Sequence, residues 1–514
     1  MGHDMEEIVV VLDFGSQYAQ LIARRIRELG VYCEIVRHDI SEEEVSKLGP
    51  AAIVLSGGPS SVFEQGHPRL DRRILKMGIP VLGICYGMQL IAVIMGGKVE
   101  KGKGGEYGPA RIKVEEPAGI FKYMPSSLDV WMSHGDHVTT LPEGFRIMAG
   151  TPSCPISAMA SGTIYGIQFH PEVVHTPRGA DIIRNFLFNV AACSGEWTMG
   201  KFVDESVEKI KTVVGNHNVI CGLSGGVDSS VTAALIHRAI GDQMKAIFVD
   251  NGLLREGEVE GIRHMFTHDY PLNFRIVDAA DLFIDELKGV VDPEAKRKII
   301  GKTFIDVFYE AASDVQGAKF LAQGTLYPDI IESRSAFGGP SSTIKSHHNV
   351  GGLPEDLNFE LLEPLKELFK DEVRLLGKEL GLPVKLLSRQ PFPGPGLGVR
   401  IIGEINREDL ATLRAADLIV REEIERYDKH NEIWQFFAVL LPVKSVGVMG
   451  DERTYANVVA LRAVTSMDAM TADWARIPYD VLGCISSRII NEVKGVNRVV
   501  YDISSKPPST IEWE

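Results

Sequence analysis

The first 190 residues alternate short apolar runs with longer stretches in which apolar side chains recur at helical spacing. Strands are predicted for the apolar runs at residues 8–12, 52–55, 81–84 and 164–169. Helices are predicted for the amphipathic stretches at residues 18–29, 70–77 and 88–95. Strands that alternate with helices are typical of an α/β domain with a parallel sheet, whose binding sites lie at the carboxyl ends of its strands.

The alternation of strands and helices resumes after a polar break at residues 193–201. Past residue 385 the composition shifts, and the alternation is no longer regular. The second region predicts strands at residues 219–223, 245–249 and 320–323, and helices at 202–214, at 231–239 and from 293 onward. Proline and glycine alternate through residues 389–398, which excludes a helix or a central strand there. The last region predicts helices at residues 407–427 and 478–493 and strands at 438–441, 456–464 and 498–502. We therefore predict two doubly wound parallel-sheet α/β domains (1–195 and 196–389) and a small α+β C-terminal domain (390–514).

Composition narrows the class of protein. With 45% hydrophobic and 24% charged residues in 514, the chain has the composition of an ordinary globular protein, and no apolar run is long enough to span a membrane. The N-terminus is acidic and has no signal peptide, so we expect a cytoplasmic protein without a membrane partner. The net charge of −15 disfavours a nucleic-acid partner. Six scattered cysteines with no Cys-x-x-Cys pair argue against a disulfide framework or a zinc site.

Cys85 lies between a predicted strand and a predicted helix, with Gly83 and Gly87 two residues to either side. This spacing permits the sharp, strained turn of a nucleophile elbow, and the following helix N-terminus favours the thiolate. His170, at the end of another strand, is a candidate base, and Glu172 can orient it. A glycine pair at residues 57–58 can turn backbone N–H groups toward an oxyanion. The pattern Cys, His, Glu at strand ends indicates a thiol-dependent hydrolytic centre.

Residues 7–192 closely resemble a class I glutamine amidotransferase domain. The resemblance implies that Cys85 attacks the side-chain amide of glutamine, that His170 transfers the proton, and that Glu172 orients His170. It also implies oxyanion-hole N–H groups from Gly58 and Tyr86. Glutamine would be held by Gln89 and by Ser133 and His134, in a predicted loop at residues 133–136. The product, ammonia, then requires a second site that consumes it.

The stretch Ser224-Gly225-Gly226-Val227-Asp228-Ser229-Ser230 joins a predicted strand to a predicted helix. Its glycines, hydroxyls and helix N-terminus predict an anion site, with phosphate as the expected ligand. Asp228 stands where a Walker loop has its lysine, which disfavours simple γ-phosphate transfer and favours a bound Mg²⁺. The stretch resembles the loop of ATP pyrophosphatases, which implies that all seven residues bind ATP. Asp250, after the next strand, is expected to contact the nucleoside or the metal.

Taken over its full length, the chain resembles the GMP synthetase (glutamine-hydrolysing) family. The motifs already quoted, Gln-Pro-Phe-Pro-Gly-Pro-Gly from Gln390, and the Lys-Pro-Pro and Ile-Glu-Trp-Glu segments of the tail follow the family's order. The resemblance implies that Mg-ATP adenylylates the C2 oxygen of XMP and that ammonia then displaces AMP to leave GMP. It also implies a homodimer formed through the C-terminal domain. The positions that match XMP contacts are Arg297, Gln435, Lys506 and Glu512.

Two further segments have an expected role. Residues 338–352 form a Gly/Ser-rich stretch that contains Lys345, and we interpret it as a mobile lid that brings Lys345 to XMP, with plain disorder as the alternative. The tail at residues 504–514 contains prolines, an isoleucine and a tryptophan, so we expect it to be docked.

Three other functions fit part of the pattern. Another glutamine-dependent adenylating amidoligase would share both motif sets and differ in its acceptor pocket. A tRNA-thiolating enzyme would share the phosphate loop but needs a basic RNA-binding face, which a net charge of −15 disfavours. A catalytically inactive nucleotide-binding regulator would not need Cys85, His170 and Asp228 intact.

Overall fold

The computed structural model describes residues 7–16, 18–335, 359–428, 432–449, 452–466 and 471–514. These residues divide into two compact units, Met1–Phe202 and Val203–Glu514. Lys345 and the predicted lid at residues 338–352 lie outside the described residues. Among the described residues, no helix is both long and apolar enough to cross a membrane.

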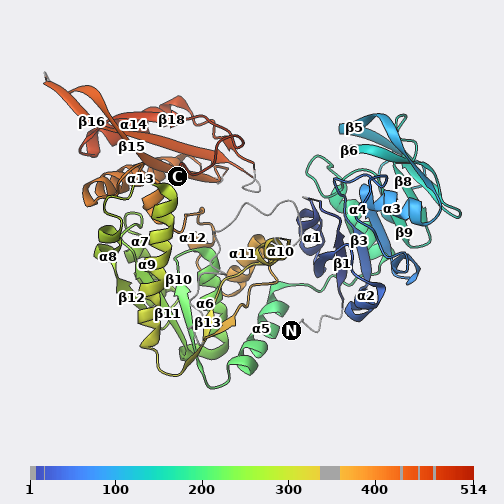
Figure 1. The fold of residues 1–514 in the computed structure, drawn as a ribbon, viewed down its shortest axis with the longest axis horizontal. Helices are drawn as coiled ribbons and strands as arrows, with labels where there is room; N and C mark the ends of the chain where they lie inside the picture. Colours follow the sequence, from blue (N-terminus) through green and yellow to red (C-terminus); the bar gives the residue numbers. More distant parts are fainter. Residues whose placement is uncertain (1–6, 17, 336–358, 429–431, 450–451, 467–470) are drawn as a thin grey trace. The chain divides into compact units, whose positions relative to one another are not determined.

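The first unit is built on one sheet of nine strands in the order β2-β1-β3-β4-β9-β8-β7-β5-β6 (Figure 1). The five strands from β2 to β9 are parallel, and the remaining strands join them in antiparallel pairs. The strands are β1 (Val9–Asp13), β2 (Cys33–Arg37), β3 (Ala52–Leu55), β4 (Val81–Ile84), β5 (Lys98–Val114), β6 (Ser127–Thr140), β7 (Arg146–Gly150), β8 (Ala158–Ser161) and β9 (Ile164–Ile167). The helices are α1 (Ala19–Glu28), α2 (Glu42–Leu48), α3 (Tyr86–Ile94) and α4 (Gly179–Asn185).

Four of the five parallel strands were predicted within two residues of their ends, because buried strands read as continuous apolar runs. Strand β2 was not predicted, since it is an edge strand that is only partly buried and contains charged residues. Two predictions were wrong. The helix expected at residues 70–77 is only a 3₁₀ turn, Ile74–Lys76. The Asp71 side chain accepts the Arg73 N–H in a local turn before it, and Gly78 at φ 75° ends it. The loop expected at residues 133–136 lies inside strand β6, whose antiparallel partner β5 supplies its hydrogen bonds.

The second unit begins with an entirely parallel sheet in the order β12-β11-β10-β13-β14. Its strands are β10 (Asn218–Leu223), β11 (Met244–Asp250), β12 (Phe274–Asp278), β13 (Ala318–Ala322) and β14 (Glu360–Leu362). The helices are α5 (Met199–Val214), α6 (Val227–Ile240), α7 (Glu258–His264), α8 (Ala280–Glu286), α9 (Pro293–Ser313), α10 (Tyr327–Ser335), α11 (Lys370–Glu379) and α12 (Val384–Leu387). Helix α9 starts with Pro293 in its first turn and Asp292 as N-cap, so this helix start follows directly from the sequence.

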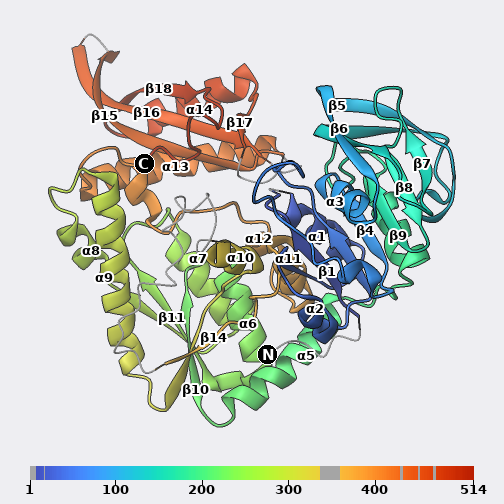
Figure 2. The ribbon, with the colours of Figure 1, turned by 45° about the vertical axis from the view of Figure 1, so that its right-hand side comes forward.

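A smaller sheet follows in the same unit. Strands β15 (Gln435–Met449), β16 (Glu452–Thr465) and β17 (Asp473–Trp474) pair in order, and β18 (Val496–Asp502) pairs in parallel with β16. Helices α13 (Arg407–Tyr427) and α14 (Tyr479–Glu492) pack beside it, as both views show (Figures 1 and 2). The predicted α/β class with two parallel-rich sheets and a small α+β region is confirmed, while the domain boundary at residue 390 stays a prediction.

Candidate active sites

Cys85 stands at the turn between β4 and α3 with backbone angles φ 51° and ψ −105°. A non-glycine residue rarely adopts a positive φ, so the surrounding turn holds this strain. A Cβ atom on Gly83 would lie 2.7 Å from the carbonyl carbon of Gly87, and a Cβ atom on Gly87 would lie 2.6 Å from the carbonyl oxygen of Leu55. Both glycines are therefore required for the close strand-to-helix approach that positions the thiol, as the nucleophile-elbow prediction expects.

His170 and Glu172 follow β9 and are both buried. His170 Nδ1 donates a hydrogen bond to Glu172 Oε1 at 2.7 Å. Burial lowers the pKa of His170, but hydrogen bonds and charge interactions with Cys85 and Glu172 outweigh it and raise the pKa to about 10. A Cβ atom on Gly57 would meet His170 Cε1 at 3.2 Å and Cys85 Cβ at 3.7 Å, so the imidazole and the nucleophile meet at one point. The histidine is placed to accept the thiol proton.

The backbone N–H groups expected at the oxyanion come from two tight positions. A Cβ atom on Gly58 would lie 2.8 Å from the carbonyl oxygen of Phe14, so only glycine lets the chain pass here. Tyr86 is the first residue of α3, where a backbone N–H has no partner within the helix. The Tyr86 hydroxyl donates to the carbonyl oxygen of Pro68 at 2.6 Å, and His67 Nδ1 lies 2.8 Å from it.

A cavity of about 590 Å³ opens beside the thiol, with Gly58, Tyr86, Gln89, Ser133 and His134 among its lining residues. Gln89 Nε2 donates to the carbonyl oxygen of Asp136 at 2.8 Å, which ties α3 to strand β6. Burial lowers the pKa of His134. Every glutaminase residue predicted from the sequence thus borders Cys85 or this cavity, or orients His170.

The phosphate loop of the second unit connects β10 to α6. Gly225 has φ +72°, and Gly226 is the N-cap residue of α6. The Ser224 N–H donates to Ser229 Oγ at 3.1 Å, and Ser230 Oγ donates to the Gly226 carbonyl oxygen at 2.8 Å. These bonds preorganise a short loop whose helix N-terminus faces the expected anion.

Asp228 lies in the first turn of α6 and pairs with Lys370. Its Oδ1 atom is buried without a hydrogen-bond partner among the described residues. The backbone after β13 passes close to Asp228, since a Cβ atom on Gly324 would lie 3.4 Å from Asp228 Cβ. Because β10 lies between β11 and β13, this crevice is the point where the strand order reverses. An orphaned carboxylate oxygen at such a crevice fits a Mg²⁺ ligand. Asp250 ends β11 at the same edge, where its Oδ1 accepts the Gly252 N–H at 2.9 Å.

Two of the predicted XMP residues meet directly. Gln435 Nε2 donates to Glu512 Oε1 at 2.7 Å, and the buried Arg400 donates to both Glu512 oxygens at 2.8 and 3.1 Å. Arg297 Nη2 donates to the carbonyl oxygen of Glu514 at 2.5 Å. Lys506 forms backbone hydrogen bonds with Ala472 in the same tail region.

The tail is docked, as the sequence predicted. Ile511 is buried, and Arg462 donates to the carbonyl oxygens of Ser504, Thr510 and Ile511. Glu514 pairs at 2.5 Å with Lys296, whose side chain is completely buried. Removal of the tail would take these partners from three buried cations, Lys296, Arg400 and Arg462, so the tail supports the second unit. Lys296 would keep the carbonyl oxygen of Ile401, and Arg462 would keep Asp502.

The Pro/Gly-rich segment links the phosphate loop to the acceptor cluster. At its start, Arg389 Nη1 donates to the Gly225 carbonyl oxygen at 2.6 Å, and Arg400, two residues past its end, donates to Glu512. Between them, Phe392 packs under the guanidinium groups of Arg255 and Arg400, with ring-centroid distances of 4.6 and 5.2 Å. Burial lowers the pKa of Arg255 to about 10 and that of Arg389 to about 10. One segment thus contacts both halves of the expected nucleotide site.

The full chain has close relatives among curated proteins. It is 57% identical over 512 residues to a GMP synthase [glutamine-hydrolyzing] of Bacillus licheniformis, with 99% of each chain covered. The proteins of the same name from Bacillus subtilis and Caldanaerobacter subterraneus are each 56% identical, again with 99% of each chain covered. The chain belongs to the glutamine-hydrolysing GMP synthase family.

The family matches follow the units of the structure. Residues 10–190 match the glutamine amidotransferase class-I family, residues 198–282 match the NAD synthase family, and residues 422–513 match the GMP synthase C terminal domain. The first match contains the Cys85 elbow, the second contains the phosphate loop, and the third contains Gln435 and Glu512. The expectation drawn from resemblance is confirmed for the GMP synthase family.

Sequence reasoning did not single out several side chains at these sites. Gln168 Nε2 lies 3.6 Å from Cys85 Sγ, and its Oε1 accepts from Gln89 at 3.4 Å. Lys370 and Arg400 pair with Asp228 and Glu512 from distant segments. Gln168 could have been found, because it directly precedes the His170 motif. No motif in the sequence around Lys370 or Arg400 marks either residue as part of a site.

Proposed function

We propose that the chain makes GMP from XMP at two separate centres, with glutamine as the nitrogen donor and ATP as the activating co-substrate. Membership of the GMP synthase family gives the overall reaction, in which XMP, ATP, glutamine and water become GMP, AMP, pyrophosphate and glutamate. The observation that carries the division into two centres is the Cys85–His170–Glu172 arrangement in one unit and a phosphate loop with an acceptor cluster in the other.

At the first centre, Cys85 Sγ attacks the side-chain amide carbon of glutamine. His170 accepts the thiol proton and returns it to the departing ammonia, and Glu172 stabilises the charged imidazole. The N–H groups of Gly58 and Tyr86 stabilise the oxyanion. Gln89, Ser133 and His134 form the wall that holds the glutamine. Water then hydrolyses the thioester, which releases glutamate and restores the thiol.

At the second centre, the backbone and hydroxyl groups of residues 224–230 hold the ATP phosphates, and Asp250 contacts the nucleoside. Arg297, Gln435, Lys506 and Glu512 hold XMP, with Lys506 suited to the phosphate and Glu512 to base N–H groups. We assign Lys345 to XMP on sequence alone. Asp228 would hold Mg²⁺, which when bound neutralises charge on the departing pyrophosphate. The C2 oxygen attacks the α-phosphorus, pyrophosphate leaves, and ammonia then displaces AMP from C2.

The same proposal includes a homodimer formed through the C-terminal region, residues 390–514. The β15–β16 hairpin supports this, because Val446, Val448 and Tyr455 are 49%, 74% and 71% exposed. The oligomeric state is measured by sedimentation, and replacing Val448 and Tyr455 by serine is expected to shift a dimer toward monomer. We place the enzyme in the cytoplasm, since none of its six cysteines, all within the described residues, forms a disulfide, which suits a reducing compartment.

The test of two centres is the Cys85→Ala variant. We expect glutamine-dependent GMP synthesis to fall by about 10⁴-fold or more, because the nucleophile is lost. Synthesis from XMP, Mg-ATP and ammonium salt at alkaline pH should stay near normal, since external ammonia bypasses the first centre.

Cys193→Ala is the matched control, because Cys193 is also a buried free cysteine but is not part of the site. It should keep both activities. If Cys85→Ala still uses glutamine, Cys85 is not the nucleophile. If Cys85→Ala also loses ammonia-dependent synthesis while remaining folded, the two centres are not separable.

A further inference from the structure

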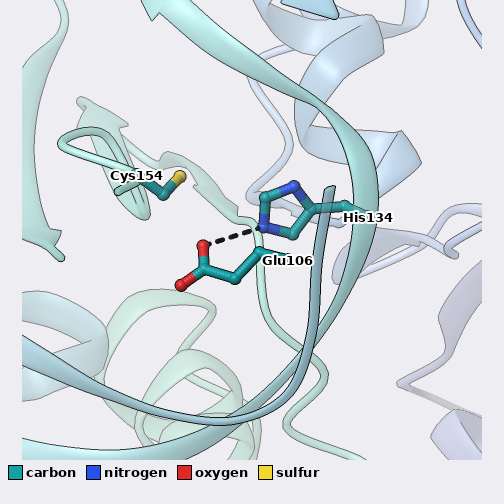
Figure 3. A group of neighbouring side chains, drawn as sticks. All are labelled: Glu106, His134 and Cys154. Carbon is teal, nitrogen blue, oxygen red and sulfur yellow. Dashed lines mark ion pairs between the residues drawn. The ribbon is translucent and has the colours of Figure 1, made fainter. Parts of the chain in front are cut away.

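Three potential metal ligands from three segments of the first unit converge beside the glutamine cavity. Glu106 on β5 and His134 on β6 are directly paired across the sheet, and Cys154 lies in the turn between β7 and β8. Figure 3 shows the three side chains turned toward one another. One ligating atom from each residue lies within 4.8 Å of the other two. This cluster is distinct from the Cys85–His170–Glu172 centre.

The hydrogen bond on one side of the His134 ring determines what the other side can do. Nδ1 lies 3.0 Å from the carbonyl oxygen of Asp136, which only accepts, so Nδ1 carries the proton of the neutral ring. Nε2 then presents its lone pair to the cluster. Metal-binding histidines are oriented in this way, by donating the other ring N–H to a backbone carbonyl.

The group opposite this lone pair is also an acceptor. Glu106 Oε2 lies 3.4 Å from His134 Nε2, and neither buried atom has a hydrogen-bond partner among the described residues. His134 as a whole is 7% exposed, so solvent does not satisfy it. With a neutral ring, two acceptors face each other here, and either a second ring proton, which gives an ion pair, or a bound cation removes their repulsion. The second Glu106 oxygen is already held by Ser153 Oγ at 3.0 Å, which orients the carboxylate.

We propose that Glu106 Oε2, His134 Nε2 and Cys154 Sγ bind one divalent transition-metal ion of the Zn²⁺ type. A nitrogen, an oxygen and a sulfur ligand are the set that Zn²⁺ accepts, and a site with three protein ligands keeps its fourth position for water. Ligands at about 2.0–2.1 Å from a tetrahedral ion lie about 3.3–3.4 Å apart, which matches the 3.4 Å between Nε2 and Oε2.

Metal binding requires that the Cys154 thiol lose its proton. The Cys154 thiol now donates to the carbonyl oxygen of Ile156 at 3.6 Å. Metal binding breaks the S–H bond, the proton passes to the solvent buffer, and the sulfur keeps the electron pair that forms the metal–sulfur bond. No oxidant or reductant takes part. Because His134 also lines the cavity at Cys85, a bound ion would fix one wall of the glutamine pocket.

Cobalt(II) titration of the metal-free full chain tests the proposal, because cobalt–thiolate bonds give an ultraviolet charge-transfer band. The titration uses the Cys85→Ala variant, so that the catalytic thiol cannot supply the sulfur ligand. We expect one cobalt per chain with the thiolate band, and displacement of cobalt by Zn²⁺. Cys154→Ser should abolish the band. Glu106→Gln should keep the band and weaken affinity by more than the roughly 10- to 100-fold that loss of an outer-shell partner costs.

Cys193→Ser in the same background is the matched control and should bind cobalt normally. Circular dichroism melts confirm that each variant is folded. If Cys154→Ser is unfolded, Glu106→Gln and His134→Gln decide the question instead. Absence of a thiolate band in the folded Cys85→Ala protein would overturn the site, and so would a band that survives Cys154→Ser. Neither outcome touches the proposed GMP synthesis, which is measured separately by ammonia-dependent turnover of the same variants.

Discussion

The two predicted reaction loops share one plan and differ in what they place at the strained position. Each is a turn from a parallel strand to a helix, β4 to α3 at Cys85 and β10 to α6 at the phosphate loop. In the first, the residue with positive φ is Cys85 itself, with φ 51°. In the second, the positive φ belongs to Gly225, with φ +72°. The positive φ falls on the functional residue in one loop, where it is strained, and on glycine in the other, where it is not.

The difference follows from which atoms do the chemistry. A nucleophile needs its side chain presented from a fixed position, so the first loop accepts the cost of a non-glycine residue at positive φ. Phosphate binding needs backbone N–H groups, so the second loop uses glycine, which adopts that conformation without strain. Burial differs in the same sense: Cys85 and His170 are 6% and 4% exposed, whereas Ser224 lies at the exposed surface of its loop.

The largest effect should come from removing the carboxylate that holds His170 beside the buried Cys85 loop. Glu172→Gln should lower glutamine-dependent synthesis by about 10⁴-fold, as in enzymes whose triad carboxylate becomes an amide. Ammonia-dependent synthesis should not change. Glu115→Gln, at an exposed carboxylate of the same unit, is the control. A variant that keeps full glutamine-dependent activity would show that Glu172 does not orient the base.

The same variant carries a pH signature. Burial lowers the pKa of His170, and its partners raise it to about 10, above the ordinary value of about 6.5. The His170–Glu172 pair therefore stabilises the fold fully below about pH 6.5, and this contribution is lost as the pH rises toward 10. In Glu172→Gln, an NMR titration should find a lower His170 pKa. The melting-temperature gap to the wild type should narrow with increasing pH.

The next effect belongs to the exposed loop. Asp228→Asn should lower XMP-dependent pyrophosphate release by about 100-fold or more, since one charge-stabilising group is lost. Synthesis from glutamine and from ammonia should fall together, unlike in Cys85→Ala. Asp242→Asn, just after the same helix, is the matched control and should leave both unchanged. Full activity of Asp228→Asn would remove Asp228 from the metal site.

The smallest effect tests the glycine itself. Gly225→Ala should destabilise the second unit by about 1–2 kcal/mol and raise the KM for ATP, because alanine is strained at this φ and its Cβ would lie 2.6 Å from Ile262 Cδ1. Gly49→Ala has a similar φ of +59° with no atom within 4 Å of the new Cβ. It should show a comparable loss of stability and an unchanged KM for ATP. Equal KM values in both variants would mean that backbone geometry at Gly225 does not matter for ATP.

The sequence by itself determined the elements and the loops that carry the chemistry. Buried parallel strands read as apolar runs, and helix α13 was predicted with the bounds Arg407–Tyr427 that the structure has. The Cys85 elbow and the phosphate loop were also predictable, because each depends on glycines within a few residues of the functional group. These are local properties, set by backbone sterics and by short-range periodicity.

Only the tertiary structure decided which distant side chains meet. Arg400 is buried against Glu512, and Lys370 pairs with Asp228. The local sequence around each of these two cations is like that around any basic residue on a protein surface. Glu106, His134 and Cys154 come together because β5 and β6 pair in one register and the β7–β8 turn reaches the same point. Strand register and packing between segments are non-local, so no spacing rule along the chain can reveal such a cluster.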